Sequence, residues 1–290
     1  MRSAKRRGYV LLLTLMLIVM ASLMLAALAR QSLMLALEAV QKQEELQARW
    51  GTISCQRAVL NRARTIFARQ IAQAADNRVP PADVRRQLSS TFELGGIPFR
   101  VILSDEDAKL NVNTVYATYG EQRTERILRQ LTASKGRLDV RLRRSSGDLA
   151  DSPTHLFRAW GQVFDHERIS PSADVASHLQ AATTEVTLWG AGRLNVYRAS
   201  DQAIEAVWHL AVGRGTPQEL QKLRRRIPPR SLWEIVAGLQ LRDHERHALE
   251  RILTDRSHGY SLWVFGPGCP TQMSLINTED NRAYTQTFIW

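Results

Sequence analysis

The longest apolar stretch of the chain runs from Tyr9 to Ala29 and reads YVLLLTLMLIVMASLMLAALA. It contains no charged residue, and its only polar interruptions are Thr14 and Ser22. A helix needs about 20 predominantly apolar residues to cross the hydrocarbon core of a bilayer. The sequence therefore predicts one transmembrane helix at 9–29, and it argues against a protein that is freely soluble at full length.

The charges around this stretch are unequal on its two sides. After it, Arg30 and Lys42 are balanced by three glutamates at 38, 44 and 45. Loops rich in lysine and arginine stay on the cytoplasmic side of a membrane. We therefore expect a cytoplasmic N-terminus, and a chain that lies outside the cytoplasm after about residue 30. The basic residues that precede the stretch are Arg2, Lys5, Arg6 and Arg7.

The chain continues as a helix beyond the apolar run. From Gln31 to Ala74 there is no proline, and Gly51 is the only glycine. Apolar residues recur mostly at three- and four-residue steps, which predicts an amphipathic continuation at 30–79 and one helix of about 60 residues. So long a helix suits packing against neighbours of its own kind. The recurring residues are Leu33, Leu37, Val40, Leu46, Trp50 and Ile53.

Three interpretations of the N-terminus compete: a secretory signal peptide, an ordinary anchor and a prepilin-type leader. A removable signal has an apolar core of roughly 7 to 15 residues, and this run is longer. Residues 6–12, RRGYVLL, resemble the prepilin peptidase site of type IV pilins and pseudopilins: a basic leader, a glycine, an aromatic residue and an apolar helix. The resemblance implies a leader at 1–8, cleavage between Gly8 and Tyr9, and methylation of the new N-terminus.

The residue at the fifth mature position distinguishes between families of pilin-like proteins. Most pilins and pseudopilins carry glutamate there, whereas this chain has Leu13. An uncharged residue at this position is similar to the protein K family of minor pseudopilins (general secretion pathway protein K) of the type II secretion system. Such a subunit has no carboxylate to pair with the N-terminal amine of a further subunit, which suits the last position at a filament tip.

Strand signals lie at both ends of the remaining chain. Pro80 and Pro81 end the helical region, and Thr91–Leu94, Gly95-Gly96 and Ile97–Leu103 read as a hairpin. Three late segments alternate in the same way, so segments 80–107 and 259–290 together predict one antiparallel sheet against the long helix. The late segments are Tyr260–Phe265, Met273–Ile276 and Tyr284–Trp290.

Between the strands, residues 108–258 are predicted to form an inserted all-helical domain. Lys109–Asn113 reads KLNVN and has an echo, RLNVY, at Arg193–Tyr197. In the protein K family two such elements each introduce helices of a SAM-like bundle, and the asparagine can cap the helix that follows. Two capping boxes, at Thr216–Glu219 and Ser231–Glu234, add helix starts. The predicted fold class is α+β, a pseudopilin fold with a helical insertion.

Acidic residues at strand ends are candidate calcium ligands, because calcium prefers hard oxygen donors. The resemblance makes calcium plausible without requiring a cofactor, and neither acidic cluster has the spacing of an EF-hand. The candidate ligands are Asp105, Asp107, Glu279 and Asp280.

Motifs of common enzyme families are missing from the sequence. The chain lacks GxSxG, Walker and dinucleotide motifs. The histidines of His244–His247 are too close together for HExxH, so this stretch is interpreted as a solvated helix face. No enzymatic activity is therefore expected.

A net charge of +11 leaves a second function open. Gly213-Arg214-Gly215 resembles a helix-hairpin-helix turn, and basic residues cluster at Arg141–Arg144 and Lys222–Arg226. The alternative is thus a membrane-tethered DNA-binding module of a competence or pilus system. A third reading, an orphan single-pass protein, differs in predicting no leader cleavage. Cys55 and Cys269 allow at most one disulfide, which the sequence does not decide.

The resemblance implies a structural role. A minor pseudopilin caps or initiates the pseudopilus tip that drives folded proteins across the outer membrane. Its expected partners are other minor pseudopilins, the major pseudopilin and the prepilin peptidase, with no small-molecule substrate and no nucleic acid. It would be a single-pass protein of the bacterial inner membrane whose C-terminal domain lies in the periplasm.

Overall fold

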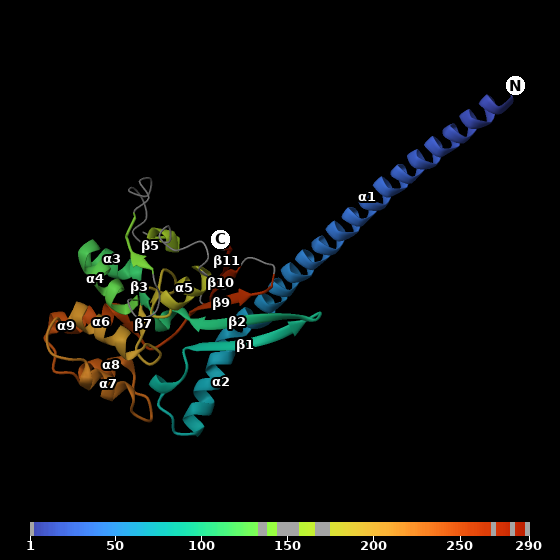
Figure 1. The fold of residues 1–290 in the computed structure, drawn as a ribbon. Coiled ribbons are helices and arrows are strands. Elements are labelled where there is room, and N and C mark those ends of the chain that lie inside the picture. Colours follow the sequence, from blue (N-terminus) through green and yellow to red (C-terminus); the bar gives the residue numbers. More distant parts are fainter. Residues whose placement is uncertain are drawn as a thin grey trace. The chain divides into compact units, whose positions relative to one another are not determined.

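The structure is a computed structural model that describes residues 3–132, 138–143, 157–165, 175–267, 271–278 and 282–287 (Figure 1). The chain divides into two compact units, residues 1–50 and residues 51–290, and each is described by itself. The first unit is helical throughout its described length. The second contains a sheet, the helix that packs on it and a largely helical insertion.

The predicted long helix is present. Helix α1 spans Ser3–Val59, and after the short 3-10 turn η1 (Leu60–Arg62) helix α2 continues over Ala63–Asp76. The helical region ends before Pro80, and Pro81 begins the 3-10 turn η2 (Pro81–Asp83). The helix ends at Asp76 because Arg78 is left-handed (φ +56°) and the N–H groups of Arg78 and Val79 bond back to the carbonyls of Ala75 and Ala74. The two prolines lack the N–H that a continuing helix would need.

Five antiparallel strands form the sheet, in the order β1-β2-β9-β10-β11. Gly95 and Gly96, with φ of +60° and +79°, make the two-residue turn between β1 and β2, a conformation that glycine adopts without strain. Strand β9 pairs with β2 over Arg100–Asp105, so the chain returns from its insertion to the strand it left. The strands are β1 (Gln87–Leu94), β2 (Ile97–Asp105), β9 (Gly259–Phe265), β10 (Gln272–Asn277) and β11 (Arg282–Thr287).

Helix and sheet share a core, as predicted. Residues of α1, η1 and α2 pack on one face of the sheet, and the Phe99 ring fills the space where a Cβ at Gly51 would lie. Side chains alternate between the faces of a strand, so Ile102 and Trp263 point the other way, into a second core shared with the insertion. The helix-side core contains Cys55, Leu60, Ala63, Phe67, Phe99, Val101, Leu103, Tyr260, Leu262, Val264 and Ile276.

The insertion is mostly helical, but the prediction of an all-helical domain is wrong. Short strands β3 (Leu110–Asn111) and β6 (Val186–Thr187) pair in parallel, as do β7 (Leu194–Asn195) and β8 (Leu253–Thr254). Two-residue strands leave no period in a sequence, so patterning misses them. An antiparallel pair, β4 (Asp139–Val140) with β5 (Phe164–Asp165), and two 3-10 turns, η3 (Glu106–Ala108) and η4 (Trp160–Gln162), complete this part. The helices are α3 (Val112–Tyr119), α4 (Glu121–Thr132), α5 (Val175–Ala182), α6 (Asp201–Ala211), α7 (Gln218–Arg224), α8 (Leu232–Ala237) and α9 (Asp243–Ile252).

The two Leu-Asn elements occupy equivalent places. Each forms the strand of a parallel pair and leads into a helix: Asn111 caps α3 by accepting a hydrogen bond from the Thr114 N–H at 3.0 Å, as predicted. Asn195 instead accepts from the Tyr197 N–H, and Ser200 caps α6. The second copy therefore keeps the strand and moves the cap by five residues, because Tyr197 and Arg198 stand where the first copy begins its helix.

Of the two predicted capping boxes, one is present. Ser231 accepts from the Glu234 N–H, and the Glu234 carboxylate accepts from the Ser231 N–H at 2.8 Å. The box at Thr216–Glu219 is wrong, since α7 starts after Pro217 and its N-cap has no side-chain hydrogen bond within the described residues.

Candidate functional site: an exposed apolar helix and a buried acidic junction

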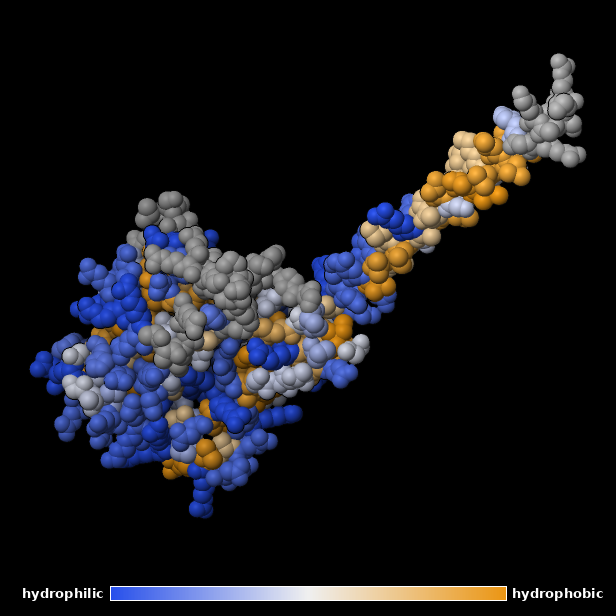
Figure 2. Space-filling view, viewed as in Figure 1, coloured by the Kyte–Doolittle hydropathy of each residue, from blue (hydrophilic) through white to orange (hydrophobic). Residues whose placement is uncertain are grey.

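The N-terminal part of α1 exposes its apolar side chains. Tyr9 is 68% exposed, and the run to Ala29 has no buried residue. Fully burying a large apolar side chain is worth about 1.5–3 kcal/mol relative to leaving it in water. Figure 2 shows this apolar surface on the first unit. Among the described residues, one helix is long and apolar enough to cross a membrane.

The predicted processing residues lie within this helix. Gly8, Tyr9 and Leu13 are all in the helical span of α1. Leu13 is 46% exposed and, like its apolar neighbours, offers no charge to a partner. The structure thus places these residues on one continuous helix, and cleavage and methylation at Gly8 and Tyr9 stay predictions.

In the second unit, three consecutive carboxylates are buried where β2 leaves the sheet. Asp105, Glu106 and Asp107 are each 1% exposed. Two buried cations face them, Lys109 at 3% exposure and Arg198 at 3%. We call these five residues the acidic junction. Because buried charges are costly unless they are paired, each carboxylate must have its own partners.

Asp107 binds backbone amides from three parts of the chain. Its Oδ1 accepts the Ala191 N–H at 2.8 Å, and its Oδ2 accepts the N–H groups of His258 and Gly259 at 2.7 and 2.9 Å. Burial raises the pKa of Asp107, and these three hydrogen bonds oppose that shift. One side chain therefore fixes the entrance of the insertion, its middle and its return to the sheet.

Asp105 faces the second cation. The Arg198 Nε lies 3.4 Å from Asp105 Oδ2, and the Ser257 hydroxyl donates to the same oxygen at 2.8 Å. Arg198 also donates to the Arg85 carbonyl and stacks over the Phe67 ring of α2 at 4.8 Å. Burial raises the pKa of Asp105 to about 6, and the attraction of Arg198 limits the rise. This pair joins the sheet, the helix and the insertion.

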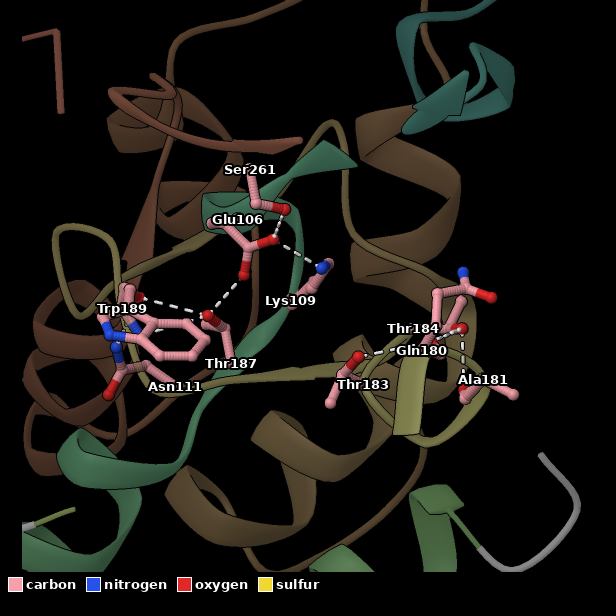
Figure 3. Close-up of polar contacts among 10 residues, drawn as sticks. All are labelled: Glu106, Lys109, Asn111, Gln180, Ala181, Thr183, Thr184, Thr187, Trp189 and Ser261. Carbon is pink, nitrogen blue, oxygen red and sulfur yellow. Dashed lines mark hydrogen bonds and ion pairs between the residues drawn. The ribbon is translucent and has the colours of Figure 1, made fainter. Parts of the chain in front are cut away.

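Glu106 is held by short polar contacts (Figure 3). Lys109 Nζ donates to its Oε1 at 2.6 Å, and the hydroxyls of Ser261 and Thr187 donate to its two oxygens. Thr187 in turn accepts from the Trp189 N–H at 3.1 Å. Figure 3 also shows the hydroxyls of Thr183 and Thr184, which donate to carbonyls at the end of α5.

The donors around these carboxylates do not fit a calcium ion. Calcium needs six to eight oxygens aimed at one point. Here both oxygens of Asp107 face amide protons, both oxygens of Glu106 face hydroxyl or ammonium donors, and Arg198 faces Asp105. Within the described residues no group of three or more His, Cys, Asp or Glu could hold a metal ion. Glu279 and Asp280 lie outside the described residues.

Several of the basic residues considered for DNA binding are engaged within the protein, and Arg144 lies outside the described residues. Arg214 donates to both oxygens of Glu245, at 2.7 and 2.9 Å. Arg224 is 1% exposed and donates to two backbone carbonyls and to Asp201. Arg141 lies 3.4 Å from Asp165. These contacts favour structural roles, and they give the DNA-binding alternative no support.

Glu245 belongs to the stretch predicted to be a solvated helix face, and for this residue the prediction is wrong. It is 2% exposed, because its carboxylate binds Arg214 and the Arg242 N–H at the start of α9. The hydrogen bond from Arg214, followed by that from Arg242, lowers the pKa of Glu245 to about 2. Of the two cysteines, Cys55 is a buried free thiol and Cys269 lies outside the described residues.

A Glu245→Gln variant should make the stability of the protein less dependent on acid pH. A carboxyl whose folded pKa is lowered stabilises the fold above its unfolded pKa of 4.5, and this contribution is lost as the pH falls toward about 2. Thermal unfolding of both proteins in detergent micelles, between about pH 6 and about pH 2.5, measures this. The matched control is Glu219→Gln on the exposed face of α7. Parallel pH curves for Glu245→Gln and the unchanged protein would contradict the prediction.

Several residues in and around the acidic junction were not recognised in the sequence. Arg198, Thr187 and Ser261 are far from Asp105–Asp107 along the chain, and isolated residues of these types carry no local signal. Asn113 is another: its amide donates to the Phe157 and Leu188 carbonyls, and its oxygen accepts the Phe157 N–H at 2.7 Å. For Asn113 the KLNVN motif was a usable signal, since polar residues within an apolar motif often satisfy buried backbone groups.

No family model and no curated protein matches the chain. Among solved structures, it is similar to a chain in the crystal structure of the GspK-GspI-GspJ complex from the type 2 secretion system of enterotoxigenic Escherichia coli. The TM-score is 0.47 and the identity is 16%, over 87% of this chain and 100% of that chain.

Proposed function

We propose that the chain is a minor pseudopilin of a type II secretion system, of the protein K type, and that it caps or initiates the pseudopilus tip. The observation that carries the proposal is the exposed apolar helix that follows Gly8-Tyr9 and has Leu13 at its fifth mature position. The continuation of this helix packs on an antiparallel sheet that a largely helical insertion interrupts, which is the arrangement that the resemblance implies.

The proposed mechanism is assembly by helix packing. Before assembly, residues 9–29 hold the subunit in the inner membrane, and the second unit lies in the periplasm. On assembly, lipid around the apolar side chains is replaced by neighbouring helices, where close van der Waals packing stabilises the contact. Leu13 offers no carboxylate to the amine of a subunit above, so growth in that direction stops.

The role is structural, without enzymatic activity. The proposed partners are other minor pseudopilins in a heteromeric tip complex, the major pseudopilin, and the prepilin peptidase that processes the leader. The proposed role requires no cofactor, and the oxygens of Glu106 and Asp107 accept hydrogen bonds from donors of the protein itself.

The leader prediction gives the first test. When the chain is made together with a prepilin peptidase, we expect the mature protein to begin at Tyr9, with or without an added methyl group. Intact mass and N-terminal sequencing of the membrane-extracted protein measure this directly. A Gly8→Leu variant should keep its leader, because the Cβ-free residue lets the protease approach the backbone closely.

The control is an Arg6→Gln variant, which keeps Gly8 and should still be cut. A start at Met1 in the presence of the peptidase would leave an ordinary membrane anchor, and a cut near Ala29 would indicate a secreted domain. Either result would overturn the proposed function.

A further inference from the structure

One exposed side of α1 beyond the apolar run has the residue spacing of a coiled coil. Leu33, Leu37, Val40, Glu44 and Gln47 follow one another at alternating four- and three-residue steps. This is the spacing of a coiled-coil seam, the side of a helix that faces a partner helix. We call these five residues the seam. All of them are exposed, and Leu33, Leu37 and Val40 are 61%, 59% and 54% exposed.

Glu44 stands apart from the other charges of this segment. At 3.6 residues per turn, Glu38, Lys42, Glu45 and Arg49 lie on the side opposite the seam. There Lys42 pairs with Glu38, and Gln41 donates to Glu45 at 3.3 Å. Glu44 is the one charged member of the seam, between Val40 and the uncharged Gln47, and it has no hydrogen bond or ion pair within the described residues.

A partner helix that covered the seam would bury Glu44. A buried charge without a partner is strongly unfavourable, and a charged residue at one seam position selects register and partner. A second copy in parallel and in register would place Glu44 against Glu44, and the two carboxylates would repel. The seam is therefore unsuited to pairing with an identical helix at the same depth.

A second copy shifted along the helix axis is also excluded, for a different reason. Arg30 occupies the seam position before Leu33, so a shift of two heptads would bring it opposite Glu44. Such a shift moves one helix by about 21 Å along the other, at 1.5 Å per residue. That is most of the roughly 30 Å hydrocarbon core, so two copies could not both keep their apolar runs in the bilayer.

We propose that the seam packs in parallel against the helix of a different single-span protein, which carries lysine or arginine at the level of Glu44. That level is about 15 residues beyond the end of its own apolar run, because two spans at the same depth bring equivalent positions together. The inference rests on the proposed function, since it requires a helix that spans the membrane and assembles with others.

Two neighbouring glutamates supply a matched test. Glu44→Lys and Glu45→Lys make the same charge change one residue apart, on the seam and on the opposite side. In the bacterium that carries the gene, a photoreactive phenylalanine at position 40 of the full chain records which protein contacts the seam. We expect Glu44→Lys to reduce the heterologous adduct by about tenfold and Glu45→Lys to leave it within about twofold.

Identification of the adduct by mass spectrometry completes the test. A partner with lysine or arginine at the predicted level, whose change to glutamate restores the Glu44→Lys adduct, supports the proposal. Equal adducts for Glu44→Lys and Glu45→Lys would overturn it, as would a partner without a cation there. Restoration by Arg30→Glu within the same chain would also overturn it, because that result indicates shifted copies of this protein.

The proposed function fails on different results. Leader cleavage and the proteins released into the medium are measured in the same strains, and an uncleaved leader or unchanged secretion after deletion of the gene would count against a pseudopilin. The crosslinking comparison tests the present inference independently of these results, because it measures a contact of the helix and not the secretion of cargo.

Discussion

An Arg198→Ala variant should lose about 3–5 kcal/mol of unfolding free energy at neutral pH, because removing one partner of a buried ion pair leaves an uncompensated charge. The remaining charge would be Asp105, which is 1% exposed and whose Oδ1 already has no hydrogen-bond partner within the described residues. The loss should be measurable by urea unfolding of the full chain in detergent micelles, followed by tryptophan fluorescence.

The pH dependence of this loss distinguishes the ion pair from simple packing. The pKa of Asp105 is raised to about 6 by burial, and Arg198 opposes the rise. A carboxyl whose folded pKa is raised stabilises the fold at low pH, and the contribution is lost as the pH rises through about 6. Without Arg198 the pKa should rise further, so Arg198→Ala should cost less stability at about pH 5 than at about pH 7.5.

A double mutant gives the control. Asp105→Asn removes the charge that Arg198→Ala leaves unpaired, so the combined variant should be more stable at neutral pH than Arg198→Ala alone. Arg256→Ala, at a residue 80% exposed in its side chain, should change stability by no more than about 0.5 kcal/mol. A pH-independent loss in Arg198→Ala that Asp105→Asn did not relieve would show that packing on Phe67 dominates.

The sheet and its helix were predictable because their signals are local. Gly95-Gly96 between alternating segments fixes a hairpin within a few residues, and a long helix needs only an absence of breakers and a recurring apolar face. The structure adds length to these elements: β1 begins at Gln87, four residues before the predicted strand. The start of β1 has a weak sequence signal, because a strand at the edge of a sheet has few buried side chains and so little hydrophobic alternation.

The acidic junction was not predictable in the same way. Three consecutive acidic residues are typical of an exposed turn, and only the fold brings Arg198, 93 residues from Asp105, to face them. The role of such a cluster depends on burial. Exposed carboxylates can bind a cation from solution, whereas these buried ones form ion pairs and hydrogen bonds with cations and N–H groups of the chain. Sequence patterning records neither burial nor contacts between distant residues.

Asp107→Ala should be about as damaging as Arg198→Ala, for a different reason. A buried N–H left without an acceptor costs about 1–3 kcal/mol. Asp107 accepts from the buried Gly259 N–H and from the partly buried N–H groups of Ala191 and His258, so we expect a loss of about 3 kcal/mol. Asp107→Asn should recover little of the lost stability. An asparagine side chain has one oxygen and one NH₂ group, so the NH₂ would face N–H groups that need an acceptor. Both can be measured by the urea unfolding of the full chain described above.

The location of the three N–H groups makes this prediction specific to the insertion. Ala191 precedes β7, His258 immediately precedes β9 and Gly259 begins it. Losing the carboxylate should therefore loosen the insertion from the sheet before the sheet itself unfolds. Limited proteolysis should then cut Asp107→Ala within the insertion, under conditions that leave the unchanged protein intact. Asp76→Asn, at the exposed end of α2, should behave like the unchanged protein. If the Asp107→Ala insertion resisted the protease as well as the unchanged one, water would have replaced the carboxylate, and the proposed role of Asp107 in joining insertion to sheet would be wrong.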